Sequence, residues 1–136
     1  MVTISSGTAW ETAWGTVSAV VFGENASAPG ASSLAIGVGA LADNQGALAF
    51  GNNAHAGGPE WYGMAVGTDS EAIGGQSISV GFNASSSADN AISFGIGTIA
   101  SAKGAVAIGT DNAGLGASST VCLLYTSPSP RDVEEW

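Results

Sequence analysis

Seven glycine residues divide this chain into units of nearly constant length. Successive members lie fourteen residues apart, except for one step of sixteen: Gly23, Gly37, Gly51, Gly67, Gly81, Gly95 and Gly109. Each glycine ends a five-residue block in which larger apolar and small residues alternate, namely AVVFG, SLAIG, ALAFG, GMAVG, SISVG, AISFG and AVAIG. Self-similarity at a short fixed period predicts that each unit is one coil of a stacked array, rather than part of a globular enzyme.

The second half of each unit repeats as well. Small residues stand three and five positions after the glycine, as at Ala26 and Ala28 or at Ala40 and Ala42. Alternation with a period of two predicts strands, and the intervening Gly, Asn, Asp and Ser residues predict turns. The expected fold class is therefore all-β, a flattened parallel β-solenoid of about seven coils that stack at about 4.8 Å each.

Composition excludes several classes of function. The chain has 21 glycines and 10% charged residues, with a formal net charge of −9 and two basic residues. Nucleic-acid binding needs clustered Lys and Arg, so we expect no nucleic-acid partner. No apolar run is long enough for a membrane helix, and the first residues lack the pattern of a secretory signal. We expect no membrane insertion by this segment, and we expect either that it is not exported by the secretory route or that its true start is missing.

The two faces of each block differ in side-chain size. In SLAIG, Leu34 and Ile36 point to one side, and Ser33 and Ala35 point to the other. Two thin layers approach closely only if the small residues face each other, so the large ones should form an outward apolar stripe: Leu34, Ile36, Leu48, Phe50, Met64, Val66, Ile78, Val80, Ile92, Phe94, Val106 and Ile108. Such a stripe predicts a homo-oligomer in which other copies cover it. The alternative is a wider monomeric roll with the large residues inside.

Blocks such as SLAIG, AVAIG and ALAFG, each followed by an A-x-A segment, resemble the YadA-like head repeats of trimeric autotransporter adhesins. The resemblance extends from Ala19 to about Ser119. It implies a left-handed parallel β-roll, a homotrimer with the apolar stripe as its seam, and display at the cell surface or outer membrane. It also implies a role in virulence through attachment to a host surface, a matrix protein or a glycan. The stalk and membrane anchor of that family are not recognisable in this sequence.

The repeat pattern stops near residue 119. The next block would end at Leu123, where the closing glycine is missing, and the chain continues from Cys122 as CLLYTSPSPRD. That string resembles the translation of a transposase-type sequencing-library adaptor. We therefore expect an N-terminal cap or irregular segment at 1–18, head repeats at 19–121 and a non-native tail at 122–136. A natural proline-containing tail is the alternative.

Residues that could support catalysis are sparse. His55 is the only histidine, and no carboxylate or nucleophile recurs with it in the repeat. Acidic residues are scattered over turns, without the regular aspartates of a calcium-binding roll. The only cysteine, Cys122, falls in the expected tail. We expect no catalytic residues, no metal and no cofactor, and the chain is not expected to be an enzyme.

The sixteen-residue step is the one irregularity inside the array. It contains HAGGPEWYG, so two extra residues should bulge from a turn beside Trp61 and Tyr62. Insertions in repeat proteins map to loops that are often functional, and exposed aromatic residues make effective contacts. The candidate ligand contacts are His55, Glu60, Trp61 and Tyr62. In the alternative, Trp61 folds back and covers the coil edge.

Two functional classes fit these observations. The first is the head fragment of a surface-displayed trimeric adhesin, in which many identical contacts supply avidity. The second is a segment of a trimeric tail fibre from a phage or prophage, since such fibres also use repetitive β-structure. A structural spacer without a ligand is a weaker third possibility.

Overall fold

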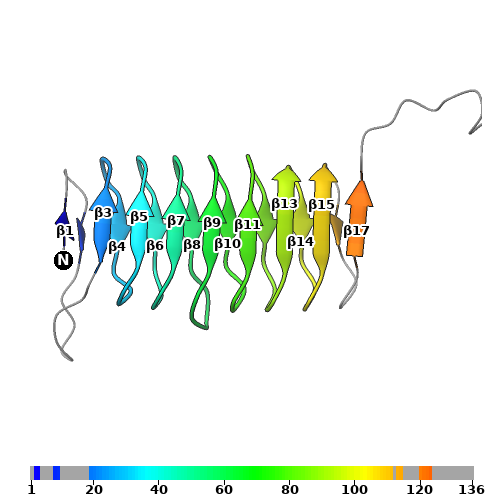
Figure 1. Ribbon diagram of the computed structural model, residues 1–136, viewed down its shortest axis with the longest axis horizontal. Helices are drawn as coiled ribbons and strands as arrows, with labels where there is room; N and C mark the ends of the chain where they lie inside the picture. Colours follow the sequence, from blue (N-terminus) through cyan, green and yellow to red (C-terminus); the bar gives the residue numbers. More distant parts are fainter. Residues whose placement is uncertain (1, 4–7, 10–18, 112, 115–119, 124–136) are drawn as a thin grey trace, which may run out of the picture.

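In the computed structural model the chain forms a flattened rod of two parallel β-sheets (Figure 1). The structure describes residues 2–3, 8–9, 19–111, 113–114 and 120–123. Sheet A contains β1 (Val2–Thr3), β3 (Val20–Phe22), β5 (Leu34–Ile36), β7 (Leu48–Phe50), β9 (Met64–Val66), β11 (Ile78–Val80), β13 (Ile92–Ile96), β15 (Val106–Thr110) and β17 (Thr120–Leu123). Sheet B contains β2 (Thr8–Ala9), β4 (Ser27–Ala28), β6 (Leu41–Ala42), β8 (His55–Ala56), β10 (Glu71–Ala72), β12 (Ser85–Ser86), β14 (Ile99–Ala100) and β16 (Ala113–Gly114).

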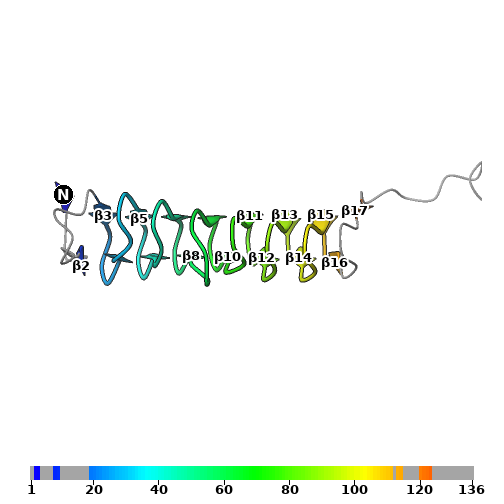
Figure 2. The same cartoon turned by 90° about the horizontal axis from the view of Figure 1, so that it is seen from below.

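Each strand pairs in parallel with the equivalent strand of the next coil. In sheet A, Leu34 stands opposite Leu48, and Leu48 stands opposite Met64, so the register follows the fourteen- and sixteen-residue steps of the sequence. Seen from below, the sheets form two layers joined by short turns (Figure 2). The expected all-β parallel solenoid of about seven coils is confirmed, and no helix occurs among the described residues.

Strands continue at both ends of the seven repeat coils. At the N-terminal end, β1 and β2 pair with β3 and β4, with Val2 opposite Val20 and Thr8 opposite Ser27. At the other end, β17 pairs with β15 and places Leu123 opposite Gly109. Most residues of the expected cap and of the expected non-native tail lie outside the described part, so both assignments stay predictions.

Small side chains fill the space between the sheets. Ala35, Ala49 and Ala65 of sheet A are fully buried, as are Ala42 and Ala56 of sheet B. Such a core allows the two layers to lie close together, because the largest fully buried side chain among the described residues is only a valine, Val21. The expected inward face is therefore correct, and the alternative of a wider roll with large residues inside is wrong.

Three inward serines connect the sheets with hydrogen bonds. The Ser79 hydroxyl donates to the Glu71 carbonyl (2.7 Å), that of Ser86 to the Ile78 carbonyl (2.7 Å) and that of Ser93 to the Ser85 carbonyl (2.6 Å). Each acceptor lies eight residues earlier, on the opposite sheet. The hydroxyls thus stand where other coils carry alanine and still have partners, as buried polar groups require.

Two backbone positions explain why glycine marks the period. The seven repeat glycines adopt φ between 131° and 145°, and a Cβ on Gly37 would collide with the Gly51 carbonyl. The residue two positions later adopts a left-handed conformation, and the chain uses only residue types that tolerate it: Asn25, Gly39, Asn53, Asp69, Asn83, Gly97 and Asp111. These paired requirements recur in every coil and fix its turn.

Candidate functional site

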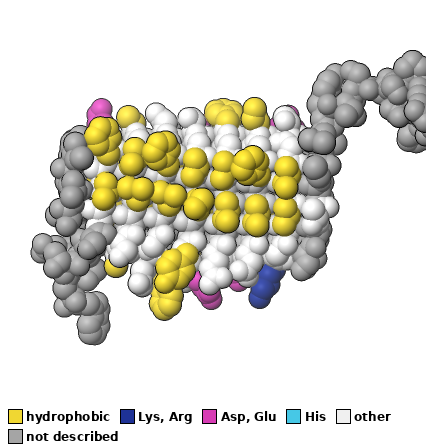
Figure 3. Space-filling view, in the orientation of Figure 1, with side chains coloured by type: hydrophobic (Ala, Val, Ile, Leu, Met, Phe, Trp, Pro, Cys, Tyr) yellow, Lys and Arg dark blue, Asp and Glu magenta, His cyan; other side chains and the backbone are white. Residues whose placement is uncertain are grey.

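Sheet A carries a continuous apolar outer face. The space-filling view shows two parallel rows of hydrophobic side chains along the rod (Figure 3). This apolar face consists of the twelve predicted stripe residues and two more, and its members are Val20, Phe22, Leu34, Ile36, Leu48, Phe50, Met64, Val66, Ile78, Val80, Ile92, Phe94, Val106 and Ile108. All of them are half-buried or exposed, and Phe94 exposes 54% of its surface. Their outward placement agrees with the sequence-based expectation.

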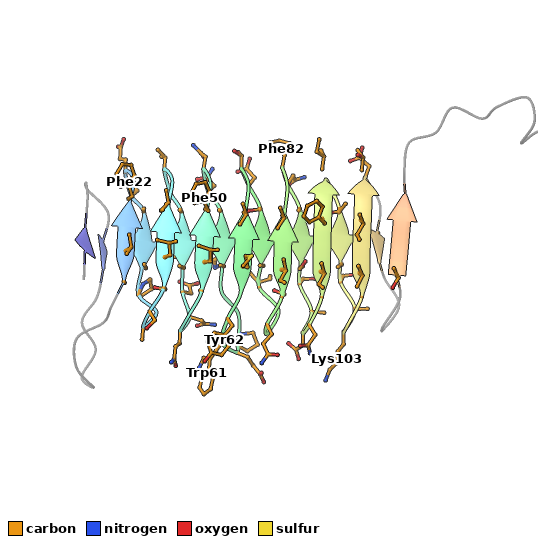
Figure 4. All side chains as sticks on the ribbon, viewed as in Figure 1. Phe22, Phe50, Trp61, Tyr62, Phe82 and Lys103 are labelled. Atoms are coloured by element: carbon orange, nitrogen blue, oxygen red, sulfur yellow. The ribbon has the colours of Figure 1, made fainter. Side chains whose placement is uncertain are left out.

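The predicted stripe left out several residues at the margin of this face. Val20 and Phe22 stand in register with Leu34 and Ile36, and the block AVVFG already contained that signal. Val38, Phe82 and Ile96 follow repeat glycines and are about half exposed. Phe22, Phe50 and Phe82 point toward one edge of the rod (Figure 4). The apolar surface is therefore wider than the predicted stripe.

The outer face of sheet B has a different character. Its outward row mixes polar, charged and apolar side chains: Ser27, Leu41, His55, Glu71, Ser85 and Ile99. Burying a large apolar side chain contributes about 1.5–3 kcal/mol, so only the face of sheet A offers a strong driving force for association. The rod thus has one face suited to contact with other chains and one suited to water.

The sixteen-residue step lengthens the connection between β8 and β9 to seven residues, against five between β6 and β7, and residues 57–62 of this connection form a six-residue turn. Residues 57–62 occupy a position where the preceding coil has only four residues, Asp43–Gly46. The Asn44 side-chain amide donates to the carbonyls of Gly58 and Glu60, the latter at 2.8 Å. The backbone ladder resumes at Tyr62, whose N–H donates to the Gln45 carbonyl at 3.0 Å. The longer turn is therefore tied to its neighbour and held in one shape.

Trp61 and Tyr62 project from this turn on the edge opposite the phenylalanines (Figure 4). Their rings meet edge to face, with centroids 6.4 Å apart. Tyr62 has φ of 70°, and its ring covers Gly46, where a Cβ would come within 2.5 Å of Cδ1. Trp61 remains 60% exposed. Tyr62 thus packs on the adjoining coil, whereas Trp61 does not fold back over it.

Pro59, Glu60 and Trp61 line an open pocket of about 360 Å³. All three residues are exposed. Of the four predicted contact residues, the structure places Glu60 and Trp61 in the pocket wall and Tyr62 beside Trp61. Asn44, which holds the turn, was missed, although it lies fourteen residues before Gly58 and so in the adjacent coil.

His55 lies at the base of the same turn. Its Nε2 is 2.9 Å from Oδ2 of Asp43, and a Cβ on Gly57 would lie within about 3 Å of both atoms. The sequence pattern showed no carboxylate that recurs with His55 in the repeat, but the structure brings a single one, Asp43, into contact with it. Asp43 is twelve residues earlier, and stacking of coils brings it alongside. The pair buttresses the start of the turn and does not line the pocket.

Comparison with protein families decides what kind of roll this is. The model of the YadA head domain repeat matches residues 17–40, 62–84 and 86–112, which together make up just over half of the chain. The chain belongs to the YadA head family. Comparisons with curated proteins and with solved structures give no match.

Membership in the YadA head family limits the chemistry to consider. The family is a structural adhesin domain from surface-exposed autotransporter adhesins, not an enzyme family. In the described part of this head, no three His, Cys, Asp or Glu residues come together to hold a metal ion. The described residues also include no helix of the length and hydropathy needed to cross a membrane. The matched segments leave out residues 41–61, and so leave out Pro59, Glu60 and Trp61 of the pocket wall.

Proposed function

We propose that this chain is a head segment of a surface-displayed trimeric adhesin that attaches a cell to host cells or extracellular matrix. The observation that carries the proposal is the apolar face of sheet A on a roll of the YadA head family. Isolated soluble proteins rarely expose so long a contiguous apolar surface. Three copies packed through this face would bury it and leave their polar faces outward.

In this assembly the partners are two further copies of the chain and a host surface or matrix component. The six-residue turn is the proposed ligand contact: Glu60 and Trp61 line its pocket, Tyr62 lies beside Trp61, and His55 lies at the start of the turn. A trimer presents three such turns, so weak individual contacts add up to avidity. The proposed location is the cell surface, at the outer membrane, and the proposed role there is adhesion without catalysis.

Sedimentation equilibrium of the full chain tests the assembly. We expect a trimer for the unaltered chain and dissociation for Ile78→Glu, because a carboxylate on the apolar face must be desolvated in the interface. Ser85→Glu, on the outer face of sheet B in the same coil, is the matched control and should remain trimeric. An unaltered chain that sediments as a monomer at micromolar concentration contradicts the proposal.

Attachment is tested with beads that carry the full chain. Adhesion predicts binding of the beads to cultured epithelial cells or to matrix-coated surfaces, and little binding by beads carrying the Ile78→Glu variant. Beads that instead bind only bacterial cells would favour the tail-fibre alternative over an adhesin.

A further inference from the structure

The pocket on the six-residue turn is preformed. Asn44 ties the Gly58 and Glu60 carbonyls to the preceding coil, and Gln76 N–H donates to the Trp61 carbonyl from the following coil at 3.2 Å. Hydrogen bonds to the turn's backbone thus fix it from both sides. A volume of about 360 Å³ is near the lower end of the range for ligand pockets, so it suits one side chain or one small group.

The pocket wall combines three kinds of surface. Trp61 supplies an exposed aromatic ring, Glu60 supplies a carboxylate and Pro59 supplies an apolar ring. An aromatic face attracts a cation through its quadrupole, most strongly in the case of tryptophan. A guanidinium can stack on such a ring while it donates hydrogen bonds to a carboxylate, and its alkyl stem can lie on an apolar surface.

The surrounding charges favour the same kind of ligand. Seven acidic residues and one lysine, Lys103, occur among the described residues. Asp89 accepts a hydrogen bond from Gly75 N–H at 3.0 Å, and Glu60 Cβ lies close to the same glycine, so two carboxylate side chains approach this edge together. In the described part, the one contact of a carboxylate with a basic side chain joins Asp43 to the His55 imidazole, and it does not involve the Glu60 carboxylate.

Lys103 lies farther along the same edge (Figure 4), in the third turn after the six-residue turn. A negative field of this kind attracts cationic partners and repels anionic ones, and it gives a neutral sugar no electrostatic advantage. Among the ligands that an exposed tryptophan could contact, charge complementarity therefore favours a cation over an anion or a neutral sugar.

From this geometry we infer that the pocket of Pro59, Glu60 and Trp61 binds an arginine or lysine side chain in a basic segment of a partner protein. The inference rests on the proposed attachment function and names the chemistry of the partner. It concerns a feature outside the segments that match the family, because residues 57–61 are not among them.

A pair of synthetic peptides provides the direct test. One is fluorescein-labelled Gly-Ser-Arg-Gly-Ser-Arg-Gly-Ser, and the other has citrulline, the neutral isostere, in place of each arginine. Fluorescence anisotropy with the full chain should show binding of the arginine peptide and at least about fivefold weaker binding of the citrulline peptide. Binding should weaken as salt rises, since the site is exposed.

Variants locate the binding in the pocket. Trp61→Ala should weaken arginine-peptide binding about tenfold, Trp61→Phe should weaken it less, and Glu60→Gln should weaken it several-fold and reduce its salt dependence. Gln45→Ala is the matched control, because Gln45 is exposed on the neighbouring turn and contributes only its carbonyl to Tyr62. It should bind as the unaltered chain does. Circular dichroism of each variant verifies that the roll is intact.

Several results would overturn the inference. Equal binding of the arginine and citrulline peptides would exclude recognition of charge. Unchanged binding by both Trp61→Ala and Glu60→Gln would place the site elsewhere, and displacement of the arginine peptide by neutral oligosaccharides would identify a sugar pocket instead. If Trp61→Ala beads attach as well as unaltered beads, the pocket is not the contact, while the adhesin proposal stands. If the chain binds the arginine peptide but is monomeric and attaches to nothing, the adhesin proposal fails and the pocket chemistry stands.

Discussion

At the scale of single residues, the repeat depends on backbone conformation more than on side-chain chemistry. Gly37 has φ of 132° and its Cα faces the Gly51 carbonyl, so both conformation and space exclude a side chain. Gly39 has φ of 69°, and a Cβ there would lie nearest to Asn53 Oδ1, a side-chain atom that can move. The same position carries asparagine or aspartate in other coils. Two glycines two residues apart therefore differ in what they tolerate.

A pair of substitutions measures this difference. Gly37→Ala should lower the free energy of unfolding by more than about 1–3 kcal/mol, because the unfavourable φ alone costs that much and the collision with Gly51 adds to it. Gly39→Asn should change it by less than about 0.5 kcal/mol, since asparagine accepts the left-handed conformation. Urea unfolding followed by circular dichroism, at one protein concentration, compares the two. Equal destabilisation would mean that the Gly37 collision does not govern the repeat.

At the scale of strands and turns, period-two alternation predicted which residues face inward, because small size was the only way to bring two layers close. The alternation did not predict the contact of His55 with Asp43 or the hydrogen bond from Asn44 to the Gly58 carbonyl, because both form between coils. Contacts of this kind depend on which side chains are brought together when the coils stack. A single histidine or asparagine leaves no periodic signal in the sequence. The three hydrogen bonds that serine hydroxyls make between the sheets were missed for a related reason. A pattern that requires only a small residue does not distinguish serine from alanine.

The six-residue turn is an element that can be exchanged without changing the register. Replacing residues 57–62 with the four-residue sequence of Asp43–Gly46 restores the fourteen-residue step, and the turn after β10 already has that length. We expect the roll to keep its circular dichroism spectrum and to unfold at the same or a higher temperature, because a shorter loop costs less entropy to close and Tyr62 leaves its strained conformation. Loss of the folded spectrum would show that the insertion is structural.

At the scale of the whole molecule, each coil contacts mainly the coils on either side of it. The described strands pair with the equivalent strands one coil away, so stability is approximately a sum of coil and interface contributions. The molecule should therefore tolerate removal of a complete coil better than removal of part of one. Residues 78–91 form such a unit, since Ile92 is the register partner of Ile78.

Two deletions of very different size test this view. Removal of residues 78–91 joins Ser77 to Ile92 and keeps small residues inward, and Ser93 takes the place of Ser79 opposite the Glu71 carbonyl. We expect a folded rod that is shorter by about 4.8 Å and has a slightly lower melting temperature. Deletion of Ser79 alone removes one residue but brings Val80 to an inward position that Ala65 and Ser93 occupy in the two neighbouring coils. Overpacking there costs about 1–3 kcal/mol, and a slip of one residue would turn every later apolar side chain inward. Small-angle scattering and thermal unfolding should therefore show the fourteen-residue deletion to be the milder change, and the reverse order would contradict a structure built from independent coils.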